Sequence, residues 1–261
     1  MIDRVLGVDA CKAGWVGIVL DGNAVTAFVA ATIADLVAQA EGSQTEGSQT
    51  GIGQSGIAQT GIAHVEARDR AGRLAAIGID IPIGLAEHRL RRCDVLARAA
   101  AGPRRSSVFV TPVRAALACP DFTSAVALNR QRTGVGFSIQ AYGLKAKILD
   151  VDAFVHGSTR PVVEVHPELS FGAMAGRPLS DPKTTWAGLQ TRRRLLLNEG
   201  IDVDGDLGGT LATAGRRTGI DDLLDAAAAA WTARRVARGD AISRPDPPEL
   251  LEDGSSAAIW T

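Results

Sequence analysis

Four aspartates stand where a carboxylate is costly unless it binds something. Asp9 ends the apolar run LGVD, and Asp80 ends a second run, IGID, with the same pattern. Burying a carboxylate costs several kcal/mol unless it is paired or bound to a metal ion. Asp222 and Asp225 are three residues apart in DDLLDAAAAA, so a helix places both on one face. Because Mg²⁺ and Mn²⁺ favour carboxylate oxygens, these side chains predict a divalent-metal site.

Two divalent ions about 4 Å apart can activate a water molecule and stabilise the leaving oxygen of a phosphodiester. Each acid also has a plainer interpretation, since a strand-end acid can hold a turn and Asp222 can cap a helix.

Glu164 and His166 form a second candidate pair within the motif EVHPE. On a strand both side chains point to the same face. They could supply a fifth metal ligand and a general acid or base, or they could bind a ribose or a phosphate. The alternative is structural: Glu164 pairs with an arginine, and His166 ends a strand before Pro167.

Several basic and hydroxyl side chains could hold phosphate. The loop GPRRSS offers arginines as bidentate donors and serines as hydroxyl donors, with Arg105 and Ser106 as the preferred candidates. The alternative is a basic loop that packs on neighbouring acids. Lys12 follows Asp9 closely and could reach a substrate phosphate, and a helix carrying Lys145 would add positive field. The predicted phosphate-binding residues are Lys12, Arg104, Arg105, Ser106 and Lys145.

Charge is distributed unevenly along the chain of 261 residues, although its formal net charge is only −1. Between positions 89 and 147 eleven Lys or Arg residues face two acids. Such asymmetry suggests an anionic partner, with a solvated arginine-rich surface as the alternative. Hydrophobic residues make up 46% and charged residues 22%, which excludes a fully disordered or coiled-coil chain. No apolar run reaches the roughly 18 residues that a membrane span requires.

The elements that must position these residues follow from the hydrophobic pattern. Three strands with short links predict an antiparallel meander, and Thr32 is placed to cap the helix that follows. The run LAAIGIDI predicts a strand buried on both faces. We expect strands over 5–9, 14–20, 24–30, 74–81, 161–165 and 257–260. We expect helices over 32–40, 87–101, 122–132, 138–155, 184–199 and 221–238, a loop over 205–219, and Trp15, Trp186 and Trp231 in the core.

This order predicts one domain over residues 1–261, with a mixed α/β sheet covered by helices on both faces. Residues 41–73 repeat EGSQT and related pentapeptides without an aromatic residue, so they predict a flexible low-complexity insertion. Residues 87–155 predict a basic helical insertion. The small alanines that follow Asp225 would let the last long helix lie close to the sheet.

The chain resembles the RNase H-like superfamily, which includes RNase H, the Holliday-junction resolvase and transposases. In that fold the first strand of a three-stranded meander carries an Asp, the fourth strand carries another acid, and a late helix carries the last one or two. More closely, the chain resembles the domain of unknown function 429 family, commonly predicted to be an RNase H-like nuclease. The matching motifs are GVDACKAGWVG, IGIDIPIGL, GPRRSSVF, EVHPELSF, KTTWAGL and DDLLDAAAAAW.

The resemblance implies a nuclease or phosphodiesterase that uses Mg²⁺ or Mn²⁺ and acts on nucleic acid or a nucleotide. It also implies that Asp9 bridges two ions, that Asp80 binds one, and that Asp222 with Asp225 completes the other. Two alternatives share the fold: a nucleotide-binding ATPase whose first hairpin, with Gly14 and Gly17, cradles phosphate, and a non-catalytic protein that binds metal or nucleic acid. Three scattered cysteines without metal-ligand spacing suggest a reduced, cytoplasmic protein. A homodimer is our expectation for the assembly.

Overall fold

The first half of the sheet is an antiparallel meander. The computed structural model describes residues 4–42, 72–203 and 209–261. The strands β1 (Val5–Cys11), β2 (Gly14–Asp21) and β3 (Ala24–Ala30) follow one another through short turns. β1 pairs antiparallel with β2, and β2 pairs antiparallel with β3. The predicted meander is therefore confirmed.

The second half of the sheet is mostly parallel. The strand order is β3-β2-β1-β4-β5-β7-β6. The strands β4 (Ala76–Ile79), β5 (Val162–Val165) and β7 (Ser256–Trp260) extend the sheet from β1 in parallel. The edge strand β6 (Ser243–Leu250) runs antiparallel to β7. Its sequence SRPDPPEL did not predict a strand, and its prolines are tolerated because an edge strand needs only half of its hydrogen bonds.

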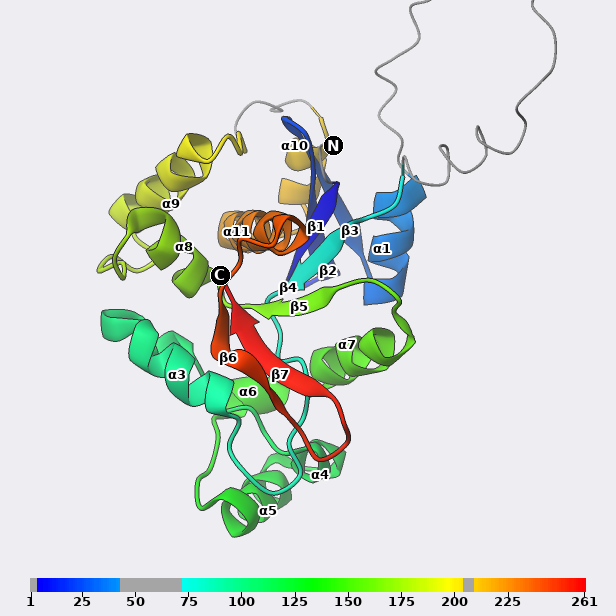
Figure 1. The fold of residues 1–261 in the computed structure, drawn as a ribbon, viewed down its shortest axis with the longest axis vertical. Coiled ribbons are helices and arrows are strands. Elements are labelled where there is room, and N and C mark those ends of the chain that lie inside the picture. Colours follow the sequence, from blue (N-terminus) through cyan, green and yellow to red (C-terminus); the bar gives the residue numbers. More distant parts are fainter. Residues whose placement is uncertain (1–3, 43–71, 204–208) are drawn as a thin grey trace, which may run out of the picture.

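One face of the sheet is covered by the long helix α11 and three shorter helices (Figure 1). Side chains from the odd-numbered positions of β1 and from β2 pack there against the alanines of α11, with Phe171, Leu196 and Leu211 from the neighbouring helices. These helices are α8 (Pro167–Ala175), α9 (Trp186–Asn198), α10 (Thr210–Gly215) and α11 (Ile220–Arg238).

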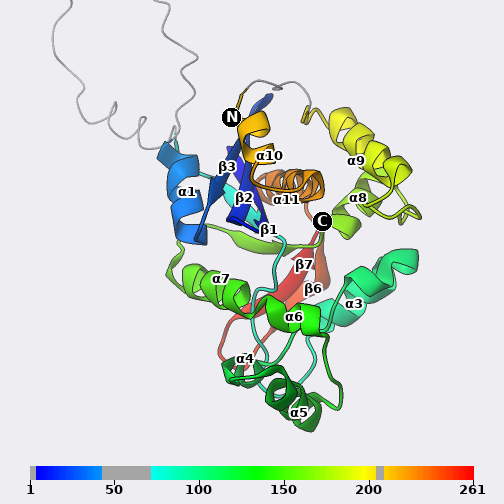
Figure 2. The ribbon, with the colours of Figure 1, turned by 180° about the vertical axis from the view of Figure 1, so that it is seen from behind.

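The opposite face is covered by α1 and α7 (Figure 2), and Leu117 of α4 joins the same hydrophobic cluster. Leu6 and Val8 of β1 and Ile77 and Ile79 of β4 pack into this second layer. Its helices are α1 (Ile33–Gly42), α4 (Arg114–Ala118) and α7 (Lys145–Gly157). Thr32 caps α1, as predicted, by accepting a hydrogen bond from the Asp35 amide at 3.1 Å. The sheet is thus flanked by helices, in agreement with the RNase H-like fold expected from the sequence.

Residues 87–155 form a helical lobe beside β6 and β7. Helix α3 packs on β6 and β7, and α4, α5 and α6 enclose a small core around Phe137. Several arginines of this segment are paired with acids: Arg89 pairs with Glu249 outside the segment, and Arg114 pairs with Asp253 outside it and with Asp152 within it. The elements added here are α3 (Arg92–Ala100), the 3-10 helix η1 (Gly102–Ser107), α5 (Phe122–Thr133) and α6 (Ile139–Gly143).

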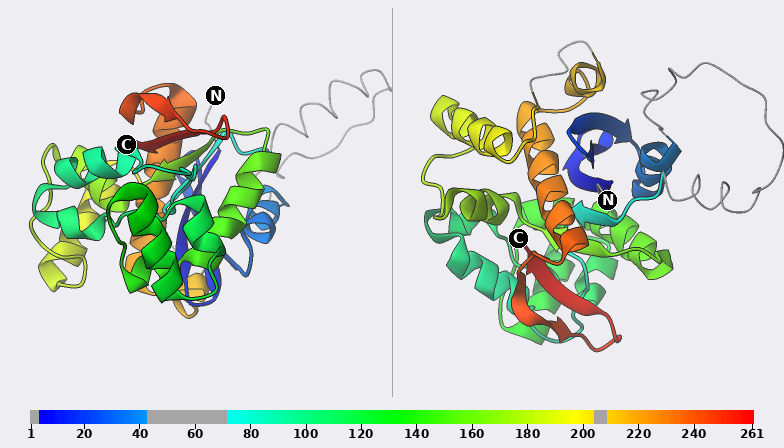
Figure 3. Two further views of the ribbon diagram at one scale, coloured as in Figure 1. Left: turned by 90° about the horizontal axis from the view of Figure 1, so that it is seen from below. Right: turned by 45° about the horizontal axis from the view of Figure 1, so that its top comes forward.

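Helix α11 lies unusually close to the sheet, and two glycines make this possible (Figure 3). A Cβ atom on Gly7 would meet the Ala230 amide nitrogen at 1.9 Å and the Ala226 oxygen at 2.2 Å. A Cβ atom on Gly78 would meet the Ala229 oxygen at 2.6 Å. The two glycines are paired in register between β1 and β4. The expectation that small residues let this helix approach the sheet is therefore confirmed.

Some sequence expectations were wrong. The helix expected over 87–101 begins only at Arg92, because Arg91 is extended and its side chain is used in a buried ion pair. The helix expected over 138–155 is divided at Leu144, and α10 lies within the expected loop over 205–219. Helices α4 and α8 were not predicted. Most of the insertion predicted over 41–73 lies outside the described residues.

The tryptophans give a mixed result. Trp15 and Trp231 are buried as expected, and their indoles donate to Asp150 and Glu199 at 2.8 and 2.9 Å. Trp186 is instead 75% exposed, because it occupies the first turn of α9 on the side facing solvent. Among the helices in the described parts of the chain, none combines the length and apolar character that crossing a membrane requires.

Candidate metal centre

Sheet register brings Asp9 and Asp80 together. In the parallel ladder between β1 and β4, Gly7 pairs with Gly78 and Val8 pairs with Ile79. Asp9 and Asp80 are the next residues, directly after the paired stretch, where β4 ends and β1 continues to Cys11. Since side chains alternate between faces, each aspartate shares the face of the glycine two positions before it. That face is the one covered by α11.

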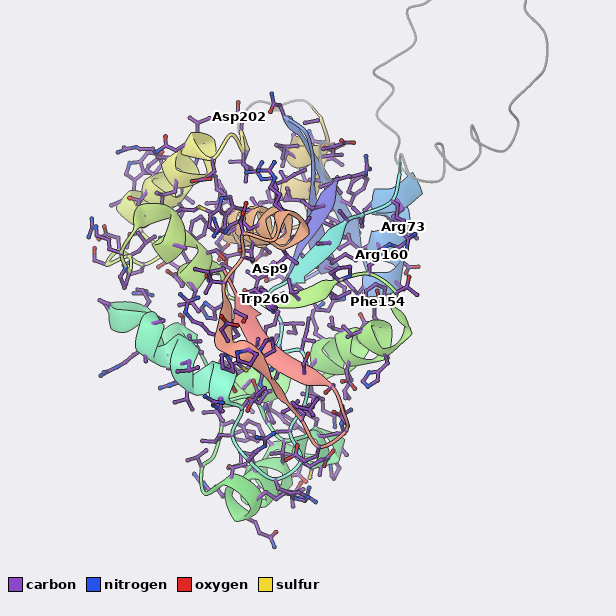
Figure 4. The ribbon with its side chains drawn as sticks, viewed as in Figure 1. Asp9, Arg73, Phe154, Arg160, Asp202 and Trp260 are labelled. Atoms are coloured by element: carbon purple, nitrogen blue, oxygen red, sulfur yellow. The ribbon has the colours of Figure 1, made fainter. Side chains whose placement is uncertain are left out.

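Helix α11 supplies the third carboxylate. Asp225 precedes the alanines that contact Gly7 and Gly78, so the close approach of the helix also lowers Asp225 onto the strand ends. Carboxylate oxygens of Asp9, Asp80 and Asp225 all lie within 4.8 Å of one another. Figure 4 marks Asp9 beside α11 near the middle of the molecule. This grouping of three acids from three elements could hold a metal ion.

The three carboxylates repel one another in a buried setting. Burial raises the pKa of Asp9 well above its ordinary value, and the charges of Asp80 and Asp225 raise it further. Burial and Asp225 likewise raise the pKa of Asp80. Burial raises the pKa of Asp225 to about 6, although a nearby lysine lowers it. Within the described residues the Asp80 carboxylate accepts no hydrogen bond and forms no ion pair. Such a set of oxygen donors fits a divalent cation.

Lys183 is a residue of the centre that our sequence analysis did not select. Its ammonium group contacts the Asp225 carboxylate and lies 3.6 Å from an Asp221 oxygen. Burial opposes the charged lysine, but Asp225 and Asp9 outweigh that effect, so its pKa lies above the ordinary value. The ammonium therefore remains charged and balances part of the negative charge. The only signal in the sequence was its place in the motif KTTWAGL.

Glu168 and Arg192 are a further pair that the sequence did not reveal. Both guanidinium bonds to the Glu168 carboxylate measure 2.8 Å, and the Arg192 side chain is 1% exposed. Arg192 also donates to the carbonyl oxygen of Asp181, two residues before Lys183, at 3.1 Å. Glu168 contributes to the raised pKa values of Asp80 and Asp225, so it lies near the centre. The pair anchors the turn that carries Lys183.

Asp222 lies outside the three-carboxylate group. Its carboxylate accepts the Thr218 hydroxyl at 2.7 Å and the Gly219 amide at 3.0 Å, so it caps the start of α11. This is the plainer interpretation that the sequence left open. Asp222 still contributes to the raised pKa of Asp9, which places its charge close to the centre.

Glu164 is engaged in a buried ion pair. Its two oxygens accept from Arg91 at 2.7 and 2.9 Å, and one also accepts the Ile83 amide at 2.7 Å. Val163 and Val165 pack against Ala229 of α11, so strand alternation turns Glu164 to the opposite face from Asp9. The structure therefore does not bring Glu164 into the carboxylate group. It holds the loop that follows Asp80.

His166 sits between the centre and η1. Its Nε2 lies 3.4 Å from the Ser107 carbonyl oxygen, and its Nδ1 is buried without a hydrogen-bond partner. Burial lowers the pKa of His166, so the ring is neutral near pH 7. Glu168 and Lys183 both act on this pKa, which places the ring near them.

The predicted phosphate-binding residues are spread over three places. Arg104, Arg105 and Ser106 lie on η1, next to the residue that His166 approaches. The Lys145 ammonium donates to the Cys119 carbonyl at 2.8 Å and so points toward the end of α4. Lys12 is exposed just after β1, three residues beyond Asp9 in the sequence.

The glycines of the first hairpin have packing roles. Gly14 has a φ of 126°, and a Cβ atom there would meet the Ala30 oxygen at 2.2 Å. A Cβ atom on Gly17 would lie 2.9 Å from Leu6 and 3.0 Å from Leu36, inside the core. Both glycines are thus explained by close packing, which gives no support to a phosphate cradle of the ATPase kind.

A comparison with protein-family profiles identifies the family of the chain. The profile described as "Protein of unknown function (DUF429)" matches residues 7–250. The chain belongs to this family. The matched region includes Asp9, Asp80 and Asp225. A search of curated proteins and a search of solved structures each gave no significant match.

Proposed function

We propose that this DUF429 protein is a metal-dependent phosphodiesterase of the RNase H-like kind, acting on nucleic acid or a nucleotide with Mg²⁺ or Mn²⁺. The observation that carries the proposal is the approach of the Asp9, Asp80 and Asp225 carboxylates to within 4.8 Å at the ends of two strands. Oxygen-only donors of this kind suit hard divalent cations. When bound, the cation supplies Lewis acidity toward the phosphoryl oxygens.

The residues of the chain divide the remaining work. Asp9, Asp80 and Asp225 hold the cation, while Lys183 provides a fixed positive charge beside Asp225. This lysine replaces the second ion that the sequence led us to expect, so we favour a single cation. The neutral His166 ring is suited to accept a proton, and Lys12 to hold a phosphate. Glu164 and Glu168 act as positioning residues through Arg91 and Arg192.

Hydrolysis of a simple phosphodiester tests the proposal. Bis(p-nitrophenyl) phosphate and short DNA and RNA strands are incubated with Mn²⁺ and wild-type protein or Asp9→Asn. Wild type should cleave at least one substrate. The cleavage rate of the variant should fall by about 100-fold or more, since losing an outer-shell partner of a metal ligand already costs about 10–100-fold. Arg238→Gln is the matched control, because it removes an exposed charge at the far end of α11. Equal cleavage by wild type and Asp9→Asn would refute the proposal.

A further inference from the structure

A hollow of about 840 Å³ opens beside the candidate metal centre. Its walls come from the residues that end β1, the start of α7 and the segment that leads into α11. Figure 2 shows β1 ending between the α10–α11 pair and α7. This volume lies within the range of about 300–1,000 Å³ that is typical of small-molecule sites, so it exceeds the space that one phosphate needs.

The hollow is lined by four cationic side chains, Lys12, Lys147, Arg216 and Arg217. The side chains of Lys12, Arg216 and Arg217 are exposed, and in the described parts of the chain none of the three forms an ion pair. Lys147 is half-buried over the Trp15 ring at 4.4 Å and donates to the Gly14 carbonyl. Three of these cations are therefore available to an anion.

The acids of the hollow are already engaged. Asp222 accepts hydrogen bonds from Thr218 and Gly219, and Asp221 lies 3.6 Å from the Lys183 ammonium. The four cations of the lining also outnumber these two acids, so the net formal charge that faces the hollow is positive. Arginines in this setting favour phosphate because they offer two parallel donors.

The hollow adjoins the metal centre but is distinct from it. Its lining begins at Ala10, directly after Asp9, and includes Asp222, one helical turn before Asp225. None of the three carboxylates that could hold a metal is part of the lining. If the reacting phosphodiester of a substrate lies at the carboxylates, the neighbouring part of that substrate would thus extend into the cationic hollow.

We propose that the hollow binds a second phosphate group of the substrate. This phosphate is next along the substrate to the phosphodiester that lies at the three carboxylates. This inference rests on the proposed function, because it assumes that the reacting phosphodiester lies at the three carboxylates. It narrows the substrate class to compounds with at least two phosphates. The second phosphate can belong to the backbone of a polynucleotide or to a free nucleotide. Both sources share the chemistry that Lys12, Arg216 and Arg217 recognise.

Binding without metal tests the inference independently of catalysis. Fluorescence anisotropy in EDTA follows a labelled single-stranded thymidylate of about eight nucleotides, a length within the usual site sizes of single-strand binders. Affinity is measured from 50 to 200 mM NaCl. For a single strand the slope of log K against log[salt] is negative, and its magnitude falls by about 0.7 for each phosphate that is no longer neutralised. Because the hollow holds one phosphate, Arg216→Gln/Arg217→Gln should reduce the magnitude of the slope by about 0.7, and Lys12→Gln should reduce it by less.

Matched controls and a second probe complete the experiment. Arg194→Gln/Arg238→Gln removes the same charge from exposed positions of α9 and the end of α11, and it should retain the wild-type slope. Circular dichroism confirms that each variant is folded. Competition with unlabelled ATP separates the two sources: displacement by ATP supports a free nucleotide, and resistance to ATP supports a polynucleotide.

Two results would overturn the inference. One is a slope and affinity for Arg216→Gln/Arg217→Gln equal to those of the control double variant. The other is a wild-type protein that binds neither probe. A protein that binds through these arginines but never hydrolyses a phosphodiester would instead contradict the proposed function alone, so the two failures are distinguishable.

Discussion

At the scale of single residues, the candidate metal centre brings three mutually repelling aspartates together. Their carboxylates lie within 4.8 Å of one another in a buried setting, which raises the pKa of each. Lys183 neutralises only part of this negative charge, through its ion pair with Asp225. A centre built in this way is less stable without its cation than with it, because the repulsion persists until a positive charge arrives.

The first prediction concerns the pH dependence of the metal-free protein. The pKa of Asp225 is about 6 in the folded chain against an ordinary value of 3.8. Between these values the folded state binds more protons than the unfolded state, so the free energy of unfolding should fall as pH rises from about 4 to about 6. Thermal unfolding in a chelator measures the trend. Asp80→Asn should show a weaker fall, and an equal trend in both proteins would contradict the repulsion.

The second prediction contrasts two aspartates. Asp80→Asn removes a half-buried charge that repels two neighbouring carboxylates, so the metal-free protein should gain about 1 kcal/mol in unfolding free energy and lose Mn²⁺ binding. Asp222→Ala removes the cap of α11, so it should lose about 1 kcal/mol and keep Mn²⁺ affinity within a few-fold. Denaturant unfolding and titration calorimetry measure both quantities. Loss of Mn²⁺ binding in Asp222→Ala would restore Asp222 as a ligand.

At the scale of elements, the site depends on how closely α11 approaches β1 and β4. The hydrophobic pattern predicted these three elements, and Asp9, Asp80 and Asp225 could be selected because each stands at the end of an apolar segment. Lys183 and Glu168 could not be selected in this way. They belong to a turn and to the start of α8, and only the buried Arg192 brings them to the centre.

Glu164 shows a second limit of sequence reasoning at this scale. Its strand and its alternation were predictable, but the face that it occupies depends on which side of β5 contacts α11. Val163 and Val165 take that side, and Glu164 is left to pair with Arg91. A helix α3 that starts at Arg92 and leaves Arg91 extended is a tertiary effect that local pattern does not contain.

The third prediction tests the helix–sheet contact. Gly7→Ala places a methyl group 1.9 Å from the Ala230 nitrogen, so the helix must move or the strand must bend. Overpacking against backbone should cost about 3 kcal/mol and weaken Mn²⁺ binding, because Asp225 moves with the helix. Gly143→Ala is the control, since nothing lies within 4 Å of its Cβ position and its cost should stay below about 0.5 kcal/mol. Equal effects of the two substitutions would contradict the contact.

At the scale of the whole molecule, the α/β architecture followed from the sequence and the lobe over 87–155 did so only in part. The meander, the parallel strands and the flanking helices were predicted from periodicity and turn residues. The basic charge of the lobe suggested an anion-binding surface, yet Arg89, Arg91 and Arg114 pair with acids that lie outside the lobe in the sequence. Charge counted along a chain does not reveal such pairing. The available cations lie instead around the hollow, at Lys12 and in the segment before α11.

The fourth prediction concerns global stability. A cation that binds only the folded chain stabilises it by about 2.7 kcal/mol at 100 times its Kd. For a domain of this size that corresponds to a Tm increase of roughly 5–10 °C. Differential scanning fluorimetry with Mn²⁺ should show this increase for wild type and no increase for Asp80→Asn. A similar increase in both proteins would place the binding site elsewhere.

The most direct test of the account is the anomalous diffraction of a crystal soaked in Mn²⁺. We predict one manganese peak within about 2.0–2.6 Å of carboxylate oxygens from Asp9, Asp80 and Asp225, with the Lys183 ammonium close by but not bound to it. A crystal of Asp9→Asn should lack the peak. A peak at another site, or an ordered wild-type crystal without any manganese, would contradict the metal centre on which the proposed function depends.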